Sequence, residues 1–180
     1  EIDRKLIIDL AAAVAAQSVT PRKVADVVHL RQDSLWSAKY ARLYQAIQNA
    51  SELLAAIAGL PHTIASADVG LERYQSDWFR VDQLYRWFTH AYQTADFQKP
   101  LEALKAEVDK QYANTYLYDF GGRWQQALEP TGPWKASALD PQAKFFERHV
   151  APVVKDGRTK AVVIISDGMR YEIAHELASM

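Results

Sequence analysis

The chain has 180 residues, of which 49% are hydrophobic and 24% charged, and its net charge is −1 with a pI near 6.6. This composition is typical of a soluble globular protein and excludes a disordered or membrane-embedded chain. The near-neutral charge gives no support for strong, non-specific binding to nucleic acid. The sequence has no cysteine, which excludes disulfides and thiolate chemistry and fits a cytoplasmic protein.

The N-terminal third of the sequence predicts three amphipathic helices. The first has an apolar residue at every fourth position, and the second begins at Thr20-Pro21, an N-cap followed by a proline at the first helical position. Asp33 or Ser34 can cap the third, which Gly59 and Pro61 end. The apolar faces comprise Ile2, Leu6, Leu10 and Val14; Val24, Val27 and Val28; and Leu35 or Trp36, Leu43, Ile47, Leu54 and Ile57.

The middle of the chain predicts a short turn at residues 66–74 and two further helices, which begin at Asp77 and Pro100. Gly121-Gly122 interrupts the second of them, and two glycines cost roughly 1 kcal/mol each relative to alanine in a helix. We therefore expect a kink, a break or a close helix–helix approach there. The apolar faces comprise Trp78, Val81, Leu84, Tyr85, Phe88 and Tyr92; and Leu101, Leu104, Val108, Tyr112, Leu117, Phe120, Trp124 and Leu128.

Beyond a proline- and glycine-rich loop at residues 129–139, the periodicity changes. Asp140-Pro141 starts a helix that ends at Asp156-Gly157. Residues 161–165 (AVVII) form a continuous, largely β-branched run, which suits a strand covered on both faces. A last helix is expected from about Met169. The apolar positions of the two helices are Phe145, Phe146, His149, Val150 and Val153; and Ile173, Ala174 and Leu177.

The predicted fold class is mainly α: a helical bundle followed by the first strand and helix of an α/β domain. We expect an all-helical domain at residues 1–138 and the opening helix–strand–helix of the second domain at residues 139–180. A lone strand cannot pair its own backbone, so it pairs with another molecule, packs as an exposed stub or is disordered. Because the chain opens on Glu1 and ends on Met180 inside expected helices, we expect it to be part of a longer protein.

Asp167 is the strongest candidate for a functional residue. It follows the predicted strand directly, at the carboxyl end where open α/β sheets bind ligands. Gly168 leaves the first turn clear for a cation, and Arg170 suits a phosphate oxygen or a structural ion pair. Met169 excludes a haloacid-dehalogenase nucleophile motif, and the single Gly168 excludes a glycine-rich dinucleotide turn. The alternative that Asp167 only caps the following helix stays open.

The run IISDGMRYE at residues 164–172 resembles the start of the PglZ domain, a branch of the alkaline phosphatase superfamily. Residues 77–92, 112–124 and 145–154 resemble the helical region that precedes this domain in PglZ proteins of the BREX phage-defence systems. The resemblance covers much of the chain, although only the segment around Asp167 is specific enough to be a motif.

The resemblance implies a metal-dependent phosphatase or phosphodiesterase with zinc or a similar divalent ion, and it makes Asp167 a metal ligand. The nucleophilic Ser or Thr and the other ligands are then expected beyond Met180, so the chain alone should be inactive and bind no metal. Other BREX proteins are the implied partners, a phosphate ester or nucleic acid the implied substrate, and no membrane is involved. The rival hypotheses are a helical protein–protein interaction module and, less favoured, a nucleic-acid-binding helical domain.

The other candidate groups favour structural roles. No two histidines have the spacing of a paired metal site, so none is expected to be a ligand, and His175 is expected to point away from the strand end. Aromatic residues at helical spacing are more often core than base-stacking platforms. The histidines are His29, His62, His90, His149 and His175, and the scattered basic residues are Arg31, Lys39, Arg42, Arg80 and Arg86.

Overall fold

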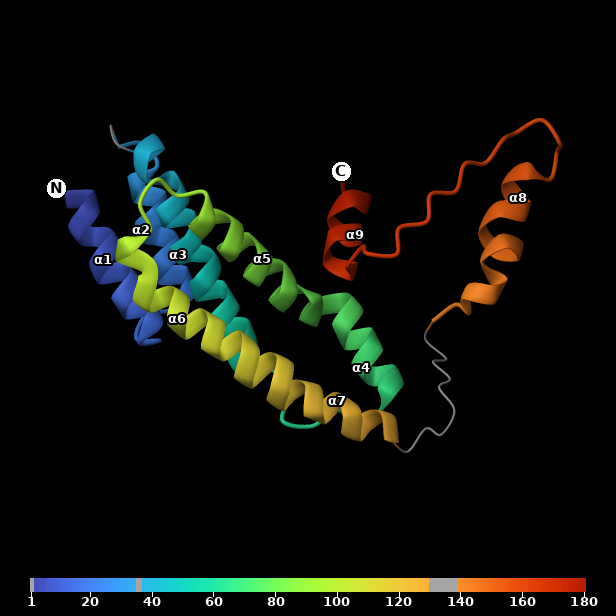
Figure 1. Cartoon of the computed structure of the whole chain (residues 1–180), viewed down its shortest axis with the longest axis horizontal. Coiled ribbons are helices and arrows are strands. Elements are labelled where there is room, and N and C mark those ends of the chain that lie inside the picture. Colours follow the sequence, from blue (N-terminus) through green and yellow to red (C-terminus); the bar gives the residue numbers. More distant parts are fainter. Residues whose placement is uncertain (1, 35–36, 130–138) are drawn as a thin grey trace.

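The computed structural model describes residues 2–34, 37–129 and 139–180. An elongated helical bundle carries a C-terminal segment that reaches away from it and returns to contact it (Figure 1). The predicted mainly α fold class is confirmed. The α-helices of the bundle are α1 (Ile2–Ala15), α2 (Pro21–Arg31), α3 (Ser37–Ala58), α4 (Ala67–Arg73), α5 (Phe79–Gln93), α6 (Glu102–Lys110) and α7 (Gly121–Leu128).

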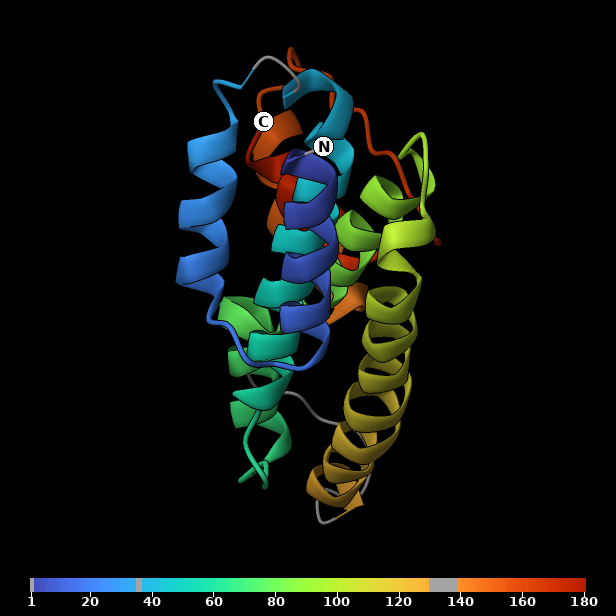
Figure 2. The ribbon, with the colours of Figure 1, turned by 90° about the vertical axis from the view of Figure 1, so that its left-hand side faces the viewer.

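Helix α3 is the centre of the bundle, because it contacts α1, α2, α5 and α6. In Figure 2, α1 lies in front of α3, with α2 on one side and α6 and α7 on the other. Ile47 and Leu53 of α3 are completely buried, as is Leu101 before α6, and Leu84 and Phe88 of α5 are nearly so. The amphipathic periodicity of the sequence therefore produces one continuous apolar core.

Several helix boundaries follow from local signals in the sequence. The Thr20 side chain accepts a hydrogen bond from the backbone N–H of Lys23, as expected for the cap of α2. Ser66 caps α4 in the same way through the N–H of Val69. Helix α3 ends just before Gly59, as predicted. The apolar stripe of α1 is shifted from the prediction: Leu10 and Val14 are buried with Ile7, whereas Ile2 is 76% exposed.

Two long helical stretches cross the bundle with fewer interruptions than expected. The segment predicted as a turn at residues 66–74 is helix α4, and a π-helical stretch, Tyr74–Trp78, leads from it directly into α5. A second π-helical stretch, Gln111–Phe120, joins α6 to α7. The expected break or close helix approach at Gly121-Gly122 is wrong. The backbone stays helical there, and an added Cβ would meet nothing within 4 Å at either glycine, so no close helix approach requires them.

The strand predicted at residues 161–165 of the C-terminal segment is not formed, although helices precede and follow it as expected. A helical stretch, with Gln142–Lys144, Phe146–Val150 and α8 (Ala151–Val154), ends before Gly157, whose φ is +68°. Residues 161–166 are extended but pair with no strand, and the described residues contain no β-ladder. Val162 and Ile165 are 87% and 89% exposed. The expected strand is not formed because an isolated strand has no neighbour to satisfy its backbone.

Leu35 and Trp36, and most of the predicted loop at residues 129–139, lie outside the described residues. The predicted inward face around Phe145 and Phe146 is exposed to solvent. The last helix, α9 (Tyr171–Ala178), begins slightly later than expected and lies against α5. No helix in the described part of the chain is long and apolar enough to cross a membrane.

Candidate functional site

Asp167 lies in a turn with Gly168, directly after the extended residues 161–166. Its side chain is exposed, and an added Cβ at Gly168 would meet no atom within 4 Å. Helix α9 begins four residues later, and its N-cap is Arg170, which makes no side-chain capping hydrogen bond. The alternative that Asp167 caps this helix is therefore wrong in this structure. Asp167 remains an exposed carboxylate at the end of an extended segment.

Asp167 belongs to no metal-binding cluster among the residues that the structure describes. Across residues 2–34, 37–129 and 139–180, no group of three or more His, Cys, Asp or Glu side chains is arranged to hold a metal ion. Catalytic zinc sites use three protein ligands, so one exposed carboxylate does not form a complete site. The residues present could supply one ligand and no more.

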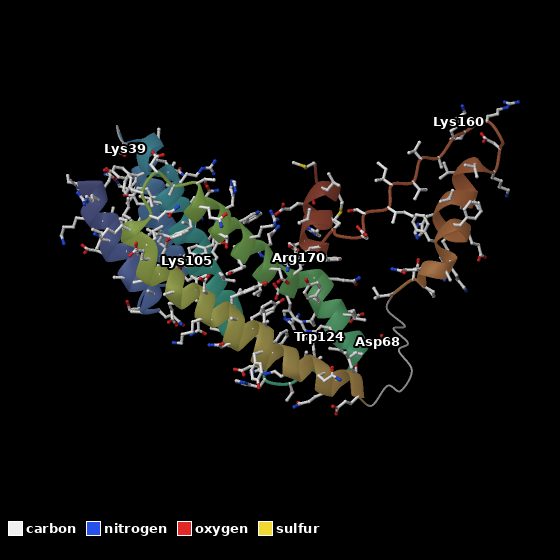
Figure 3. All side chains as sticks on the ribbon, viewed as in Figure 1. Lys39, Asp68, Lys105, Trp124, Lys160 and Arg170 are labelled. Atoms are coloured by element: carbon white, nitrogen blue, oxygen red, sulfur yellow. The ribbon has the colours of Figure 1, made fainter. Side chains whose placement is uncertain are left out.

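Arg170, the second candidate from the sequence, lies at the junction between α9 and the bundle (Figure 3). Tyr112 is the main cause of a raised pKa of Arg170, and the carboxylates of Glu172 and Asp82 act in the same direction. Arg170 thus faces the polar side chains of the bundle. Both roles expected from the sequence, a phosphate contact and a structural ion pair, stay predictions for Arg170.

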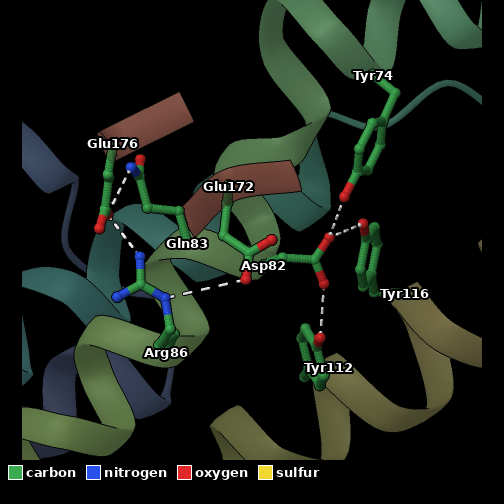
Figure 4. Close-up of polar contacts among 8 residues, drawn as sticks. All are labelled: Tyr74, Asp82, Gln83, Arg86, Tyr112, Tyr116, Glu172 and Glu176. Carbon is green, nitrogen blue, oxygen red and sulfur yellow. Dashed lines mark hydrogen bonds and ion pairs between the residues drawn. The ribbon is translucent and has the colours of Figure 1, made fainter. Parts of the chain in front are cut away.

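Asp82 of α5 is the centre of a cluster of three tyrosines beside this junction (Figure 4). Its Oδ1 accepts a hydrogen bond from the Tyr112 hydroxyl at 2.7 Å. Its Oδ2 accepts hydrogen bonds from Tyr74 at 2.9 Å and Tyr116 at 2.8 Å. Burial and the neighbouring carboxylate raise the pKa of all three phenols, which therefore stay protonated as donors. The cluster ties the π-helical stretch Gln111–Phe120 to α5 and to the stretch that leads into it.

A second polar cluster joins α9 to α5. Arg86 Nη2 donates a 2.5 Å hydrogen bond to Glu176 Oε1, which also accepts one from Gln83 Nε2 at 2.9 Å. Partial burial tends to raise the pKa of Glu176, but these hydrogen bonds outweigh it and the pKa is lowered. Glu172 is only 1% exposed, and its Oε1 lies 3.9 Å from Arg86 Nε. Two carboxylates of α9 therefore converge on one guanidinium of α5 (Figure 4).

Aromatic contacts support the same junction. The Tyr171 ring lies 5.7 Å from that of Tyr74 and 5.5 Å from that of Phe79, and its hydroxyl donates to the Gln75 carbonyl at 3.3 Å. The His175 ring lies 4.5 Å from Phe79, which gives this histidine a packing role. The apolar face predicted for α9 is wrong, because Leu177 is 59% exposed while Glu172 is buried.

Sequence reasoning therefore missed the residues that attach α9 to the bundle. A signal was available: Asp82 and Arg86 are four residues apart on α5, and Glu172 and Glu176 have the same spacing on α9. Residues four apart lie on one helix face, so each pair could have been assigned to a shared polar surface. Nothing in the sequence, however, indicates that these two surfaces meet. The predicted core role of the aromatic residues is confirmed for Trp78, Phe88, Tyr112, Tyr116 and Phe120, which are all buried.

Known proteins match this chain in two kinds of comparison. Residues 145–180 match a family model described as the BREX system PglZ alkaline phosphatase-like domain. The chain is 28% identical over 159 residues to the alkaline phosphatase-like protein PglZ of Bacillus cereus (strain H3081.97), which covers 86% of the chain and 18% of that protein. It is 30% identical over 194 residues to the alkaline phosphatase-like protein BrxZ of Escherichia coli O9:H4 (strain HS), which covers 99% of the chain and 22% of that protein.

The chain thus spans about a fifth of the length of these curated relatives. No solved structure matches it. The matched segment 145–180 contains Asp167, Arg170 and all of α9, while the relatives also align with the helical bundle. By the family model and both relatives, the chain belongs to the PglZ family of BREX alkaline phosphatase-like proteins.

Proposed function

We propose that this chain joins a helical scaffold to the start of the catalytic domain of a metal-dependent phosphatase or phosphodiesterase. The helical domain would occupy residues 1–138, and residues 139–180 would open the catalytic domain. The single observation that carries the proposal is the match of residues 145–180 to the PglZ domain, because it includes the exposed Asp167. The chain alone is proposed to be catalytically incomplete.

Asp167 is proposed to be one ligand of a divalent metal ion, with zinc as the first candidate. Its position after residues 161–166 supports this role, because those residues would become a strand once neighbouring strands cover them. The exposed Val162 and Ile165 provide the apolar surface for such a sheet. The nucleophile and the remaining ligands are expected beyond Met180, and the substrate is proposed to be a phosphate ester, including one in nucleic acid.

The bundle is proposed to position the catalytic domain and to dock other BREX proteins in the cytoplasm. The direct contact of α5 with α9 supports the positioning role. An interaction module without a catalytic role is the second candidate. The exposed Leu117 and Tyr118, 56% and 80% accessible, favour it because they present apolar surface on the outside of the bundle.

The first candidate is tested by Asp167→Ala and the isosteric Asp167→Asn in a longer protein that contains the whole PglZ domain. We expect both variants to lose bound metal, measured by elemental analysis, and to lose hydrolysis of bis(p-nitrophenyl) phosphate. Asp119→Ala, which removes an exposed carboxylate of the bundle, is the matched control and should change neither property. Full metal content and activity in both Asp167 variants would contradict the assigned role.

The second candidate is tested by affinity capture of purified BREX proteins with this 180-residue chain, with and without a metal chelator. Metal-independent capture that Leu117→Glu and Tyr118→Glu abolish would support an interaction module. Failure of every BREX protein to bind would contradict it. Because this experiment does not involve Asp167, its outcome is independent of the first test.

A further inference from the structure

Among the described residues, the contacts that tie the region of Asp167 to the bundle lie on its C-terminal side, in α9. Residues 161–166, which precede it, are exposed and form no ladder. Four residues after it, Tyr171 packs on Tyr74 and Phe79. The position of Asp167 relative to the bundle therefore depends on how firmly α9 is held.

Arg86 is the charged residue of α5 on which both acidic residues of this α9 face converge. Its Nη2 contacts Glu176 at 2.5 Å, and its Nε lies 3.9 Å from Glu172 Oε1. Neither Nε nor this Oε1 has a hydrogen-bond partner within the described parts of the chain. The Glu172 side chain is 1% exposed, so its charge requires a neighbouring cation, and the Arg86 guanidinium supplies one from α5.

We propose that Arg86 is a positioning residue for the metal site: by binding Glu172 and Glu176 it holds α9 against the bundle and thereby fixes Asp167. The inference rests on the proposed role of Asp167 as a metal ligand. Arg86 does not itself contact Asp167, and it acts through α9. Arg86 is 34% exposed and Glu176 is 31% exposed, but Glu172 is buried, so removal of Arg86 deprives a buried carboxylate of a compensating charge and disfavours the docked arrangement.

The other polar contacts of α9 complement Arg86 but do not replace it. Gln83 donates to Glu176 and carries no charge, and Arg170, which interacts with Tyr112, Glu172 and Asp82, lies next to α9 in the chain and not on α5. Without Arg86, Glu176 would keep the neutral Gln83 as its partner on α5, and Glu172 would keep Arg170 of its own segment as a neighbouring cation but lose its charge partner on α5. The buried charge of Glu172 would then favour release of α9 into water.

The first test measures hydrogen exchange of the α9 amides in this chain by mass spectrometry. Arg86→Met keeps an unbranched apolar stem and removes the guanidinium with its charge, and it should increase exchange of residues 171–178 about tenfold or more. Arg80→Met makes the same replacement at an exposed arginine of α5 and should leave exchange unchanged. Circular dichroism verifies that the bundle remains folded. Unchanged exchange in Arg86→Met would overturn the proposal.

A compensating variant separates loss of charge balance from general damage. Glu172→Gln removes the buried charge, so Arg86→Met combined with Glu172→Gln should exchange more slowly at α9 than Arg86→Met alone. If the double variant exchanges as fast as the single one or faster, Arg86 does not act through Glu172 and the proposed mechanism is wrong.

The second test measures zinc affinity in the longer protein by competition with a chromogenic chelator. Arg86→Met should weaken zinc binding about tenfold while leaving the stoichiometry at saturation unchanged, whereas Asp167→Ala should remove a bound ion. If Arg86→Met releases α9 but binds zinc normally while Asp167→Ala does not, the positioning role is overturned and the proposed function stands. If Asp167→Ala also binds zinc normally, the proposed function fails, and the positioning role fails with it.

Discussion

The bundle and the C-terminal segment use apolar residues in opposite ways. In the bundle, the apolar faces of the helices bury one another, and Ile7, Ile47 and Leu53 are fully inaccessible. In residues 139–180, the only buried residue is the carboxylate Glu172, while Val162 and Ile165 are almost completely exposed. The bundle thus contains the partners of its own apolar surface, whereas the C-terminal segment presents apolar surface that no described residue covers.

This difference shows how a sequence pattern depends on its surroundings. An amphipathic helix makes its backbone hydrogen bonds internally, so it needs only an apolar face to pack against. A buried strand needs a neighbour for its backbone and a cover for each face. Apolar residues therefore form a packed core in the bundle, whereas at residues 161–166 they lie in an exposed segment without a paired strand.

The largest effect should appear when one apolar residue from each region is truncated. Leu53→Ala should lower the free energy of unfolding by about 2–5 kcal/mol, because it leaves a cavity in the core around α3. Ile164→Ala, at a residue that is 88% exposed, should change it by about 0.5 kcal/mol or less. Urea unfolding followed by circular dichroism measures both. Equal destabilisation by the two substitutions would contradict the contrast between the regions.

A smaller effect should separate two glycines. A Cβ at Gly70 of α4 would lie 2.7 Å from Cη2 of Trp124 and 3.0 Å from Cγ2 of Ile64, so Gly70→Ala overpacks the contact between α4 and α7. We expect a loss of about 1–2 kcal/mol in thermal unfolding, because the clash outweighs the helix propensity gained. At Gly168 there is open space, and Gly168→Ala should lie within about 0.5 kcal/mol of the wild type. A stabilised Gly70→Ala would show that the Trp124 ring moves aside at no cost.

The smallest effect should be a difference in pH dependence between two aspartates. Arg31 donates hydrogen bonds of 2.9 Å to both carboxylate oxygens of Asp3, and the resulting interaction holds the pKa of Asp3 below its ordinary value of 3.8. The backbone N–H groups of Arg158 and Thr159 lower the pKa of Asp156 in the C-terminal segment. A lowered pKa in the folded state contributes stability at pH values above the ordinary pKa, and that stability is lost as the pH falls through the folded value.

Of these two aspartates, Asp3 is the one that connects elements of the bundle, because it also accepts a 2.8 Å hydrogen bond from Tyr44. The midpoint of thermal unfolding of the bundle should therefore fall as the pH drops below 4, and Asp3→Asn should make this fall shallower. Asp156→Asn should leave the pH profile of the bundle unchanged. A wild-type slope in Asp3→Asn would mean that other carboxylates control acid unfolding.

The elements that depend on local residues could be predicted from the sequence. The Thr20-Pro21 start of α2, the end of α3 at Gly59 and the aromatic core of α5 all follow from capping and periodicity. The π-helical stretch Tyr74–Trp78 after α4 could not be predicted, because no pattern in the sequence distinguishes it from an ordinary helix. The docking of α9 was missed because apolar periodicity identifies Leu177 as buried, whereas the contact contains an ion pair with Arg86 and the Tyr171 ring.

The position of Asp167 after an extended segment was predictable from the change in periodicity. The partners of that segment were not, because in the described residues no strand lies beside residues 161–166. The pairing of residues 161–166 depends on neighbouring strands, and the sequence of this segment does not say which strands those are. The assignment of Asp167 as a metal ligand therefore stays a prediction that the Asp167 variants test.

Hydrogen exchange of the amides of residues 161–165, compared between this chain and a longer protein with the whole PglZ domain, tests the central claim most directly. In this chain we expect exchange at the rate of an unfolded peptide, together with strong protection in α3. In the longer protein the same amides should become protected, because neighbouring strands would bind them. Protection of residues 161–165 in this chain alone, or rapid exchange in both proteins, would contradict the claim that this segment is a strand completed by the rest of the catalytic domain.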